Sequence, residues 1–86
     1  MVRPMYKNGA PEGGNNLCGG RVRALRLAMP GRVSQRALAE RLQIEGLDLD
    51  KNAVQRIESG ERFVTDIELR ALAQVLGVSA DELLGK

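Results

Sequence analysis

The sequence has no histidine, no tryptophan and a single cysteine, Cys18. Without these residues it can form no His/Cys metal site, Ser–His–Asp triad, Cys–His pair or internal disulfide. Aromatic residues make up only 2% of the chain, which disfavours a base-stacking sheet or an aromatic ligand cage. Neighbouring acids such as Asp81 and Glu82 lie where a helix is expected to begin, and there they serve its dipole. We therefore expect no enzyme, no catalytic residue, no metal and no cofactor.

Long apolar runs are also missing: no stretch approaches the roughly 18 residues that cross a bilayer, and the N-terminus lacks the apolar core of a signal peptide. A lone thiol is typical of a reduced compartment, so we expect a cytoplasmic protein with no membrane contact. Lysine and arginine number 13 against 11 acidic residues, a net charge of +2. Because this surplus is small, any polyanion binding depends on where the charges lie.

The chain of 86 residues has room for one small domain. Residues 1–16 are rich in glycine, proline and asparagine and show no apolar period, so we expect a flexible N-terminal arm there. Its only basic residues are Arg3 and Lys7, fewer than an arm that binds a minor groove would favour, so a passive arm is preferred. The domain itself is expected over residues 17–86.

Apolar residues at three- and four-residue spacing predict five short helices, at about residues 17–29, 35–44, 51–59, 66–76 and 80–84. Pro30 and Gly31 end the first of them. Each of the other four begins with a hydrophobic staple, in which a capping residue follows one apolar residue and precedes another by four positions. The four caps are Ser34, Asp50, Thr65 and Ser79, and Glu68 and Glu82 are placed to complete capping boxes at the last two.

Helices this short are not stable alone, so their apolar stripes are expected to meet in one core. The predicted core consists of Val22, Leu25, Leu38, Leu42, Val54, Ile57, Leu69, Leu72, Leu76, Val78 and Leu83. No segment shows convincing strand alternation. The predicted fold class is therefore all-α.

The expected helix at residues 51–59 has two chemically different faces. At about 100° per residue, its polar residues fall within an arc of roughly 140°, with apolar residues on the other side. The polar set is Lys51, Asn52, Gln55, Arg56 and Ser59, and the apolar set is Ala53, Val54 and Ile57. Arginine, asparagine and glutamine can each form bidentate hydrogen bonds to base edges, so this helix suits a DNA major groove. The alternative is an ordinary solvated amphipathic helix.

Three motifs that follow one another along the chain favour the DNA-binding interpretation of this helix over the solvated one. They are SQRALAERL at residues 34–42, VQRIESG at 54–60 and LAQVLGVSADELL at 72–84. Together they resemble the phage-repressor and Cro type of helix-turn-helix domain, the xenobiotic-response-element (XRE) family, over about residues 17–86. The resemblance implies a compact five-helix, lambda-repressor-like fold. It also implies a sequence-specific double-stranded DNA-binding transcriptional regulator, in particular a repressor.

Matching positions in this sequence indicate which residues would touch DNA. The resemblance places base reading in the major groove on Lys51, Asn52, Gln55 and Arg56. It places phosphate contacts on Gln35, at the start of the second helix, and on Ser59 and Arg62. Ser59 ends the expected helix at residues 51–59, which would be the recognition helix, and Arg62 follows it.

The turn between the second and third helices departs from the family pattern, because residues 43–49 make it several residues longer. We expect the second helix to extend to Ile44 and Gly46 to break it, with Leu47 and Leu49 returning to the core. Asp50 is the helix cap. Glu45 and Asp48 are expected in a solvated loop that faces away from DNA, since carboxylates repel phosphates.

Several other residues are expected to have structural roles. Arg21, Arg23 and Arg26 could touch phosphate, but a solvated helix face is favoured. Glu58 borders the buried side of its helix and is expected in an ion pair. Cys18 is expected to pack as a small apolar residue, and Phe63 to fill the core beneath the fourth helix.

The short recognition helix, at residues 51–59, indicates that the protein binds DNA together with a second copy of itself. One such helix covers a short site, so two copies spaced by one turn of DNA are expected, as a homodimer. We expect its interface to use the last helix and an exposed Leu84, and to be weak or to form only on DNA. The alternative function is a protein-interaction module with the same fold, such as the antitoxin of a toxin–antitoxin pair, with a protein partner.

Overall fold

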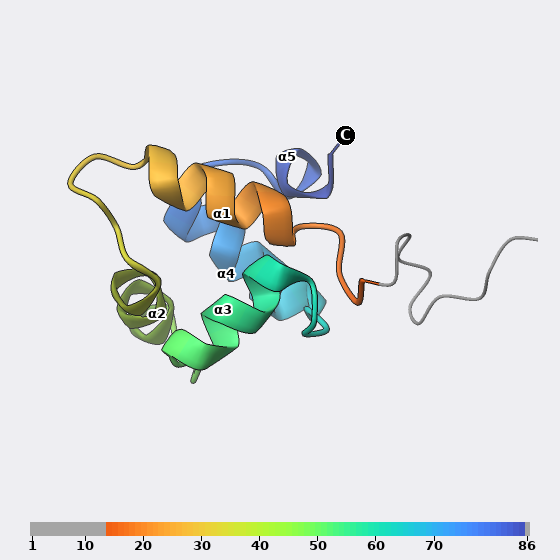
Figure 1. Cartoon of the computed structure of the whole chain (residues 1–86), viewed down its shortest axis with the longest axis horizontal. Helices are drawn as coiled ribbons and strands as arrows, with labels where there is room; N and C mark the ends of the chain where they lie inside the picture. Colours follow the sequence, from red (N-terminus) through yellow and green to blue (C-terminus); the bar gives the residue numbers. More distant parts are fainter. Residues whose placement is uncertain (1–13, 86) are drawn as a thin grey trace, which may run out of the picture.

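The computed structural model describes residues 14–85, which form five helices and no strand (Figure 1). The helices are α1 (Gly19–Ala28), α2 (Gln35–Ile44), α3 (Lys51–Ser59), α4 (Asp66–Leu76) and α5 (Ala80–Leu84). The all-α prediction is confirmed. No helix in this part of the chain is long and apolar enough to cross a membrane. Most of the expected arm, residues 1–13, lies outside the described residues.

Helix α1 is shorter than the predicted 17–29 at both ends. Its cap is Cys18, which makes no side-chain capping bond, and the first amide of the helix, that of Gly19, donates instead to Asn16 Oδ1 at 2.8 Å. At the other end Met29 is extended, with ψ 142°, because the proline that follows disfavours a helical residue before it. The bounds of α2 to α5 agree with prediction.

Side-chain caps explain that agreement. Each predicted cap accepts a hydrogen bond from the backbone amide three residues later: Ser34 from Ala37 at 3.0 Å, Asp50 from Ala53 at 2.8 Å, Thr65 from Glu68 at 3.2 Å and Ser79 from Glu82 at 3.1 Å. Thr65 and Glu68 form the complete capping box. The second predicted box is wrong, because among the described residues Ser79 and Glu82 make only one of its two bonds.

One hydrophobic core joins the helices: α1 and α2 each pack on α3 and α4, and α5 packs on α4. Eight predicted residues are buried there, namely Val22, Leu38, Leu42, Val54, Ile57, Leu72, Leu76 and Leu83. Leu25, Leu69 and Val78 are partly buried against them. The prediction for Phe63 is wrong: it is 48% exposed, and its neighbour Val64 packs against the core instead.

Cys18 lies inside this core with 2% of its surface exposed, as expected of a packing residue. Burial raises the pKa of its thiol, because a low-dielectric environment disfavours the thiolate. The adjacent Gly19 is where α1 approaches α3 most closely. A Cβ atom on Gly19 would overlap the carbonyl oxygen of Ile57 and lie 3.0 Å from that of Glu58. The approach of α1 to the C-terminal half of α3 therefore requires glycine at this position.

Two neighbouring glycines provide a matched test of this contact. Gly19→Ala is expected to lower the free energy of unfolding by about 1–3 kcal/mol, since backbone atoms must move to admit the methyl group. Gly20→Ala meets nothing within 4 Å and is expected to raise the same quantity by about 0.5–1 kcal/mol through helix propensity. Urea unfolding of both variants and the wild type measures the difference. Equal stability of the two variants would contradict the close approach.

Candidate functional site

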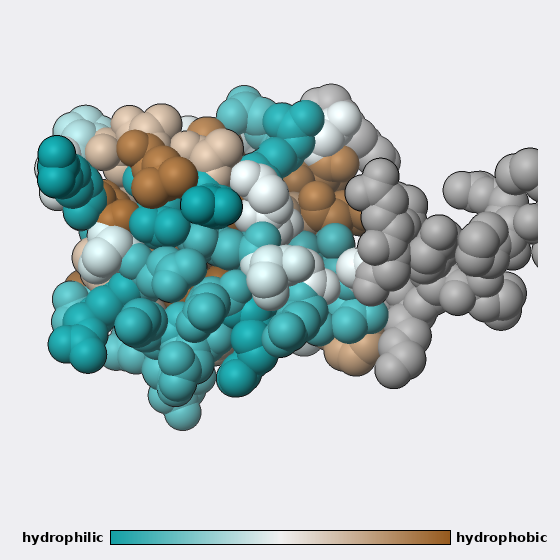
Figure 2. Space-filling view, in the orientation of Figure 1, coloured by the Kyte–Doolittle hydropathy of each residue, from teal (hydrophilic) through white to brown (hydrophobic). Residues whose placement is uncertain are grey.

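Helix α3 exposes one polar face and buries the other. Lys51, Asn52, Gln55, Arg56 and Ser59 are all exposed. On the opposite side Ala53, Val54 and Ile57 are buried in the core, so the predicted division of the helix is confirmed. In the space-filling view, hydrophilic side chains cover α2 and α3, whereas apolar ones gather over α1 (Figure 2). The polar face of α3 is thus available to a partner.

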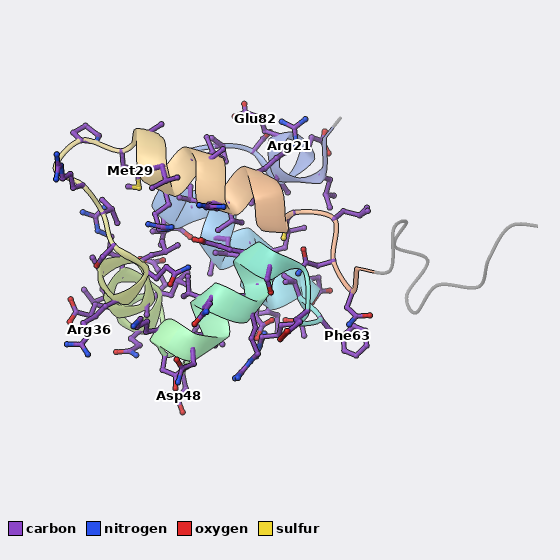
Figure 3. All side chains as sticks on the ribbon, viewed as in Figure 1. Arg21, Met29, Arg36, Asp48, Phe63 and Glu82 are labelled. Atoms are coloured by element: carbon purple, nitrogen blue, oxygen red, sulfur yellow. The ribbon has the colours of Figure 1, made fainter. Side chains whose placement is uncertain are left out.

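The long turn between α2 and α3 folds as predicted. Helix α2 ends at Ile44, and Gly46 then adopts a positive φ of 95°, a conformation that glycine tolerates. Leu49 is 5% exposed, and Leu47 is half-buried against the core. Asp48 is exposed at the outer end of this turn (Figure 3). The extra residues therefore form a compact, anchored turn.

Gln43 holds the two ends of that turn together, a role that sequence analysis did not assign. Its Nε2 donates to the carbonyl oxygen of Leu49 at 2.9 Å. Asp50 follows directly and caps α3 through Oδ1. The start of α3 is thus fixed from α2 on one side and by its own cap on the other. No spacing motif marks Gln43, so the sequence gives no signal for this bond.

A buried ion pair between Arg26 of α1 and Glu58 of α3 lies behind the polar face. Arg26 Nε is 2.6 Å from Glu58 Oε2, and Arg26 Nη2 donates to Glu58 Oε1 at 3.0 Å. Arg26 Nη1 donates to the carbonyl oxygen of Val33 at 2.9 Å. The hydrogen bond to Glu58 raises the pKa of the Arg26 guanidinium, because it favours the charged form.

The ion pair confirms the expectation for Glu58 and corrects the one for Arg26. Arg26 is only 8% exposed and does not belong to a solvated face. A signal for this was present, because Arg26 follows Val22 by four residues and so continues the buried stripe of α1. Arg21 and Arg23 are exposed, as expected.

Gln35, a predicted phosphate contact, lies against this ion pair. Its Nε2 donates to Glu58 Oε1 at 3.0 Å, which commits one of its two amide hydrogens. The second amide hydrogen and the amide oxygen make no hydrogen bond among the described residues. Gln35 therefore joins the start of α2 to α3.

Most of the predicted site residues line two hollows beside α3. One, of about 500 Å³, lies between α2 and the start of α3, and Lys51 and Asn52 line it. The other, of about 220 Å³, is lined by Arg23, Arg26, Gln35, Gln55, Glu58 and Ser59. Ser59 Oγ already donates to the carbonyl oxygen of Arg56 at 3.1 Å, so its hydroxyl would have to turn to reach a ligand. The structure thus brings Gln35, Gln55 and Ser59 together.

Arg62, the remaining predicted contact, is half-buried in an ion pair of its own. Its Nη1 donates to Glu68 Oε1 at 2.8 Å and to the carbonyl oxygen of Phe63 at 3.1 Å. Partial burial alone would raise the pKa of Glu68. Hydrogen bonds from Arg62 and from the backbone of Thr65 outweigh it and hold that pKa below the usual 4.5. Arg62 is therefore oriented by α4.

Two asparagines from the expected arm fasten the loop after α3. The backbone amide of Asn15 donates to the carbonyl oxygen of Gly60 at 2.7 Å, and its side chain to that of Glu61 at 2.8 Å. Asn16 Nδ2 donates to the carbonyl oxygens of Ile57 and Arg62. Asn15 and Asn16, which were expected in a flexible arm, are instead hydrogen-bonded to this loop and support the site.

A family model described as a helix-turn-helix domain matches residues 18–84. No curated protein and no solved structure matches the chain significantly.

The lowered pKa of Glu68 predicts a specific acid sensitivity. A carboxylate with a depressed folded-state pKa stabilises the fold fully above its unfolded pKa, and this stability is lost as pH falls through the folded value. At pH 7 the free energy of unfolding of the wild type should therefore be higher than that of Glu68→Gln by about 1 kcal/mol. This difference should disappear as the pH falls below 4.5. Urea unfolding from pH 7 to pH 3 measures it. A gap that is constant with pH would contradict the role of the Glu68 charge.

Proposed function

Because the chain belongs to the helix-turn-helix domain family, we propose that it is a sequence-specific, double-stranded DNA-binding transcriptional regulator that inserts α3 in the major groove. Membership of this family points to DNA binding, since a helix-turn-helix motif presents the second of its two helices to base edges. In this chain the two helices are α2 and α3, so α3 is the helix that would be presented. The resemblance to phage repressors favours repression through occupancy of an operator.

The observation that carries this proposal is the chemistry of the exposed face of α3. It presents Lys51, Asn52, Gln55 and Arg56, whose side chains donate to the acceptors that base pairs expose in the major groove. The one acidic residue of α3, Glu58, is hydrogen-bonded to Arg26 and Gln35. Helix α3 itself therefore offers two cations and two amides, while the carboxylates of Glu40 and Asp50 line the hollow beside Lys51 and Asn52. This local arrangement, rather than the net charge of +2, suits DNA.

Phosphate contacts at the sides of α3 would fix the register of the helix on the duplex. Gln35 offers its second amide hydrogen beside the positive end of α2. Ser59 borders the same hollow, and Arg62 lies in the loop that follows α3. Such contacts orient the protein without reading sequence, whereas contacts from α3 to base edges specify it.

The length of α3 supports binding as a homodimer. Nine residues at 1.5 Å each give a helix of roughly 13 Å, which at 3.4 Å per base pair faces only about four base pairs. Two copies related by a two-fold axis would read two half-sites about 34 Å apart. We propose that this dimer is weak or forms only on DNA and uses α5. Leu84, expected to be exposed there, is half-buried instead, in a groove that it shares with Leu17 and Leu69.

Selection from a randomised duplex library, at two salt concentrations, tests the proposed function. The wild type is expected to enrich a motif with two related halves about one helical turn apart. A variant carrying Lys51→Ala, Asn52→Ala and Arg56→Ala is expected to lose that preference but keep its fold, since all three side chains are exposed. No enrichment by the wild type, with only feeble salt-dependent binding, would contradict the proposal and favour a protein partner.

Single substitutions test the division between base reading and phosphate contact. Arg56→Ala is expected to cost about 1–3 kcal/mol on the selected site and to relax the preference at one base pair. Arg62→Ala is expected to weaken binding to all duplexes similarly and to reduce the salt dependence. Glu68→Gln is the control for Arg62, because it breaks the same ion pair but leaves the arginine in place. If Arg56→Ala and Arg62→Ala lowered the binding affinity equally on every duplex sequence, this division would be contradicted.

A further inference from the structure

Helix α1 contributes a charged side chain to the hollow beside α3. The 220 Å³ hollow is lined by Arg23 of α1 together with Gln35 of α2 and with Gln55 and Ser59 of α3. Arg23 is exposed and forms no ion pair with any residue in the range 14–85. Sequence analysis favoured a solvated face for it. The structure instead places it next to three residues expected to contact DNA.

The charge balance of the hollow depends on this arginine. Arg26 and Glu58 also line it, but their charges are paired: Glu58 Oε2 binds Arg26, and Glu58 Oε1 binds both Arg26 and Gln35. Arg23 therefore gives the hollow its net positive charge. The hollow is several times larger than the roughly 30 Å³ that one water molecule occupies in the liquid, so it can admit a tetrahedral anion.

We propose that Arg23 binds a phosphodiester group of the DNA backbone in this hollow, together with the second amide hydrogen of Gln35. The inference rests on the proposed function and adds a contact from a third helix. A guanidinium presents paired donors that match two phosphate oxygens. Arg23 and Gln35 would grip the backbone from α1 and α2 while α3 enters the groove.

The position of Arg23 on α1 follows from the packing of that helix. Arg23 precedes Arg26 by three residues, so both lie on the side of α1 that faces α3. Arg21, two residues earlier, lies on the other side of α1, beside α5 (Figure 3). A Cβ atom on Gly85, just after α5, would be 3.5 Å from Arg21 Nε. Arg21 and Arg23 are therefore equal in charge and both exposed, but only Arg23 lies at the hollow.

This difference makes Arg23→Gln and Arg21→Gln a matched pair. Binding to the duplex selected by the wild type is measured as a function of salt, and thermal unfolding verifies that each variant folds. Each phosphate contact steepens the plot of log affinity against log salt by about 0.9. Arg23→Gln is therefore expected to flatten the slope by about 0.9 for each bound protomer. The wild type would then lose roughly 3.5-fold more affinity per protomer than Arg23→Gln between 50 and 200 mM salt.

The remaining expectations separate a direct contact from a general charge effect. Arg21→Gln should keep the wild-type slope, Arg23→Lys should retain most of it, and Arg23→Gln should leave the selected sequence unchanged. Equal flattening by Arg21→Gln and Arg23→Gln, or a wild-type slope for Arg23→Gln, would overturn the inference while the proposed function stood. Absence of salt-dependent binding by the wild type to any duplex would overturn both.

Discussion

The buried pair of Arg26 and Glu58 is the contact on which the arrangement of the first three helices depends. It joins α1 to α3, and its remaining hydrogen bonds reach the carbonyl oxygen of Val33 and the amide of Gln35 at the start of α2. Removing two charges from water is costly, and the cost is met only when every donor and acceptor has a partner. A rotation of α1 or α3 would separate Arg26 from Glu58 and leave a buried charge unpaired. A shift of the start of α2 would break the hydrogen bonds at Val33 and Gln35.

The same pair sets the electrostatics of the exposed face. Glu58 lies in the helix that we propose enters the major groove, where a free carboxylate would repel phosphate. Its bonds to Arg26 and Gln35 offset that charge locally. The cations at Lys51 and Arg56 then act without an opposing charge on their own helix. A chain with a net charge of only +2 can in this way present a face suited to a polyanion.

The sequence predicted what local interactions determine. Helices α2 to α5 begin at side-chain caps, and the apolar spacing of α3 determines which face is buried, so both could be read directly. Two errors were local, namely the capping box at Ser79 and the assignment of Arg26 to a solvated face. Others concern a choice between neighbours or a contact distant in sequence. Whether Phe63 or Val64 turns inward depends on the path of a short loop, and the bond between Gln35 and Glu58 joins residues 23 positions apart. Local patterns contain no information on such pairings.

The long turn before α3 illustrates how that helix can keep its presentation despite extra residues. Lengthening a loop costs little conformational entropy, since the cost grows only with the logarithm of its length. What positions α3 is its own cap at Asp50, its buried residues Val54 and Ile57, and the bond from Gln43 to Leu49. Leu49 is itself buried, so the chain re-enters the core immediately before the helix begins. The orientation of Lys51 and Asn52 is therefore determined by the cap, by the buried residues of α3 and by the bond that closes the turn.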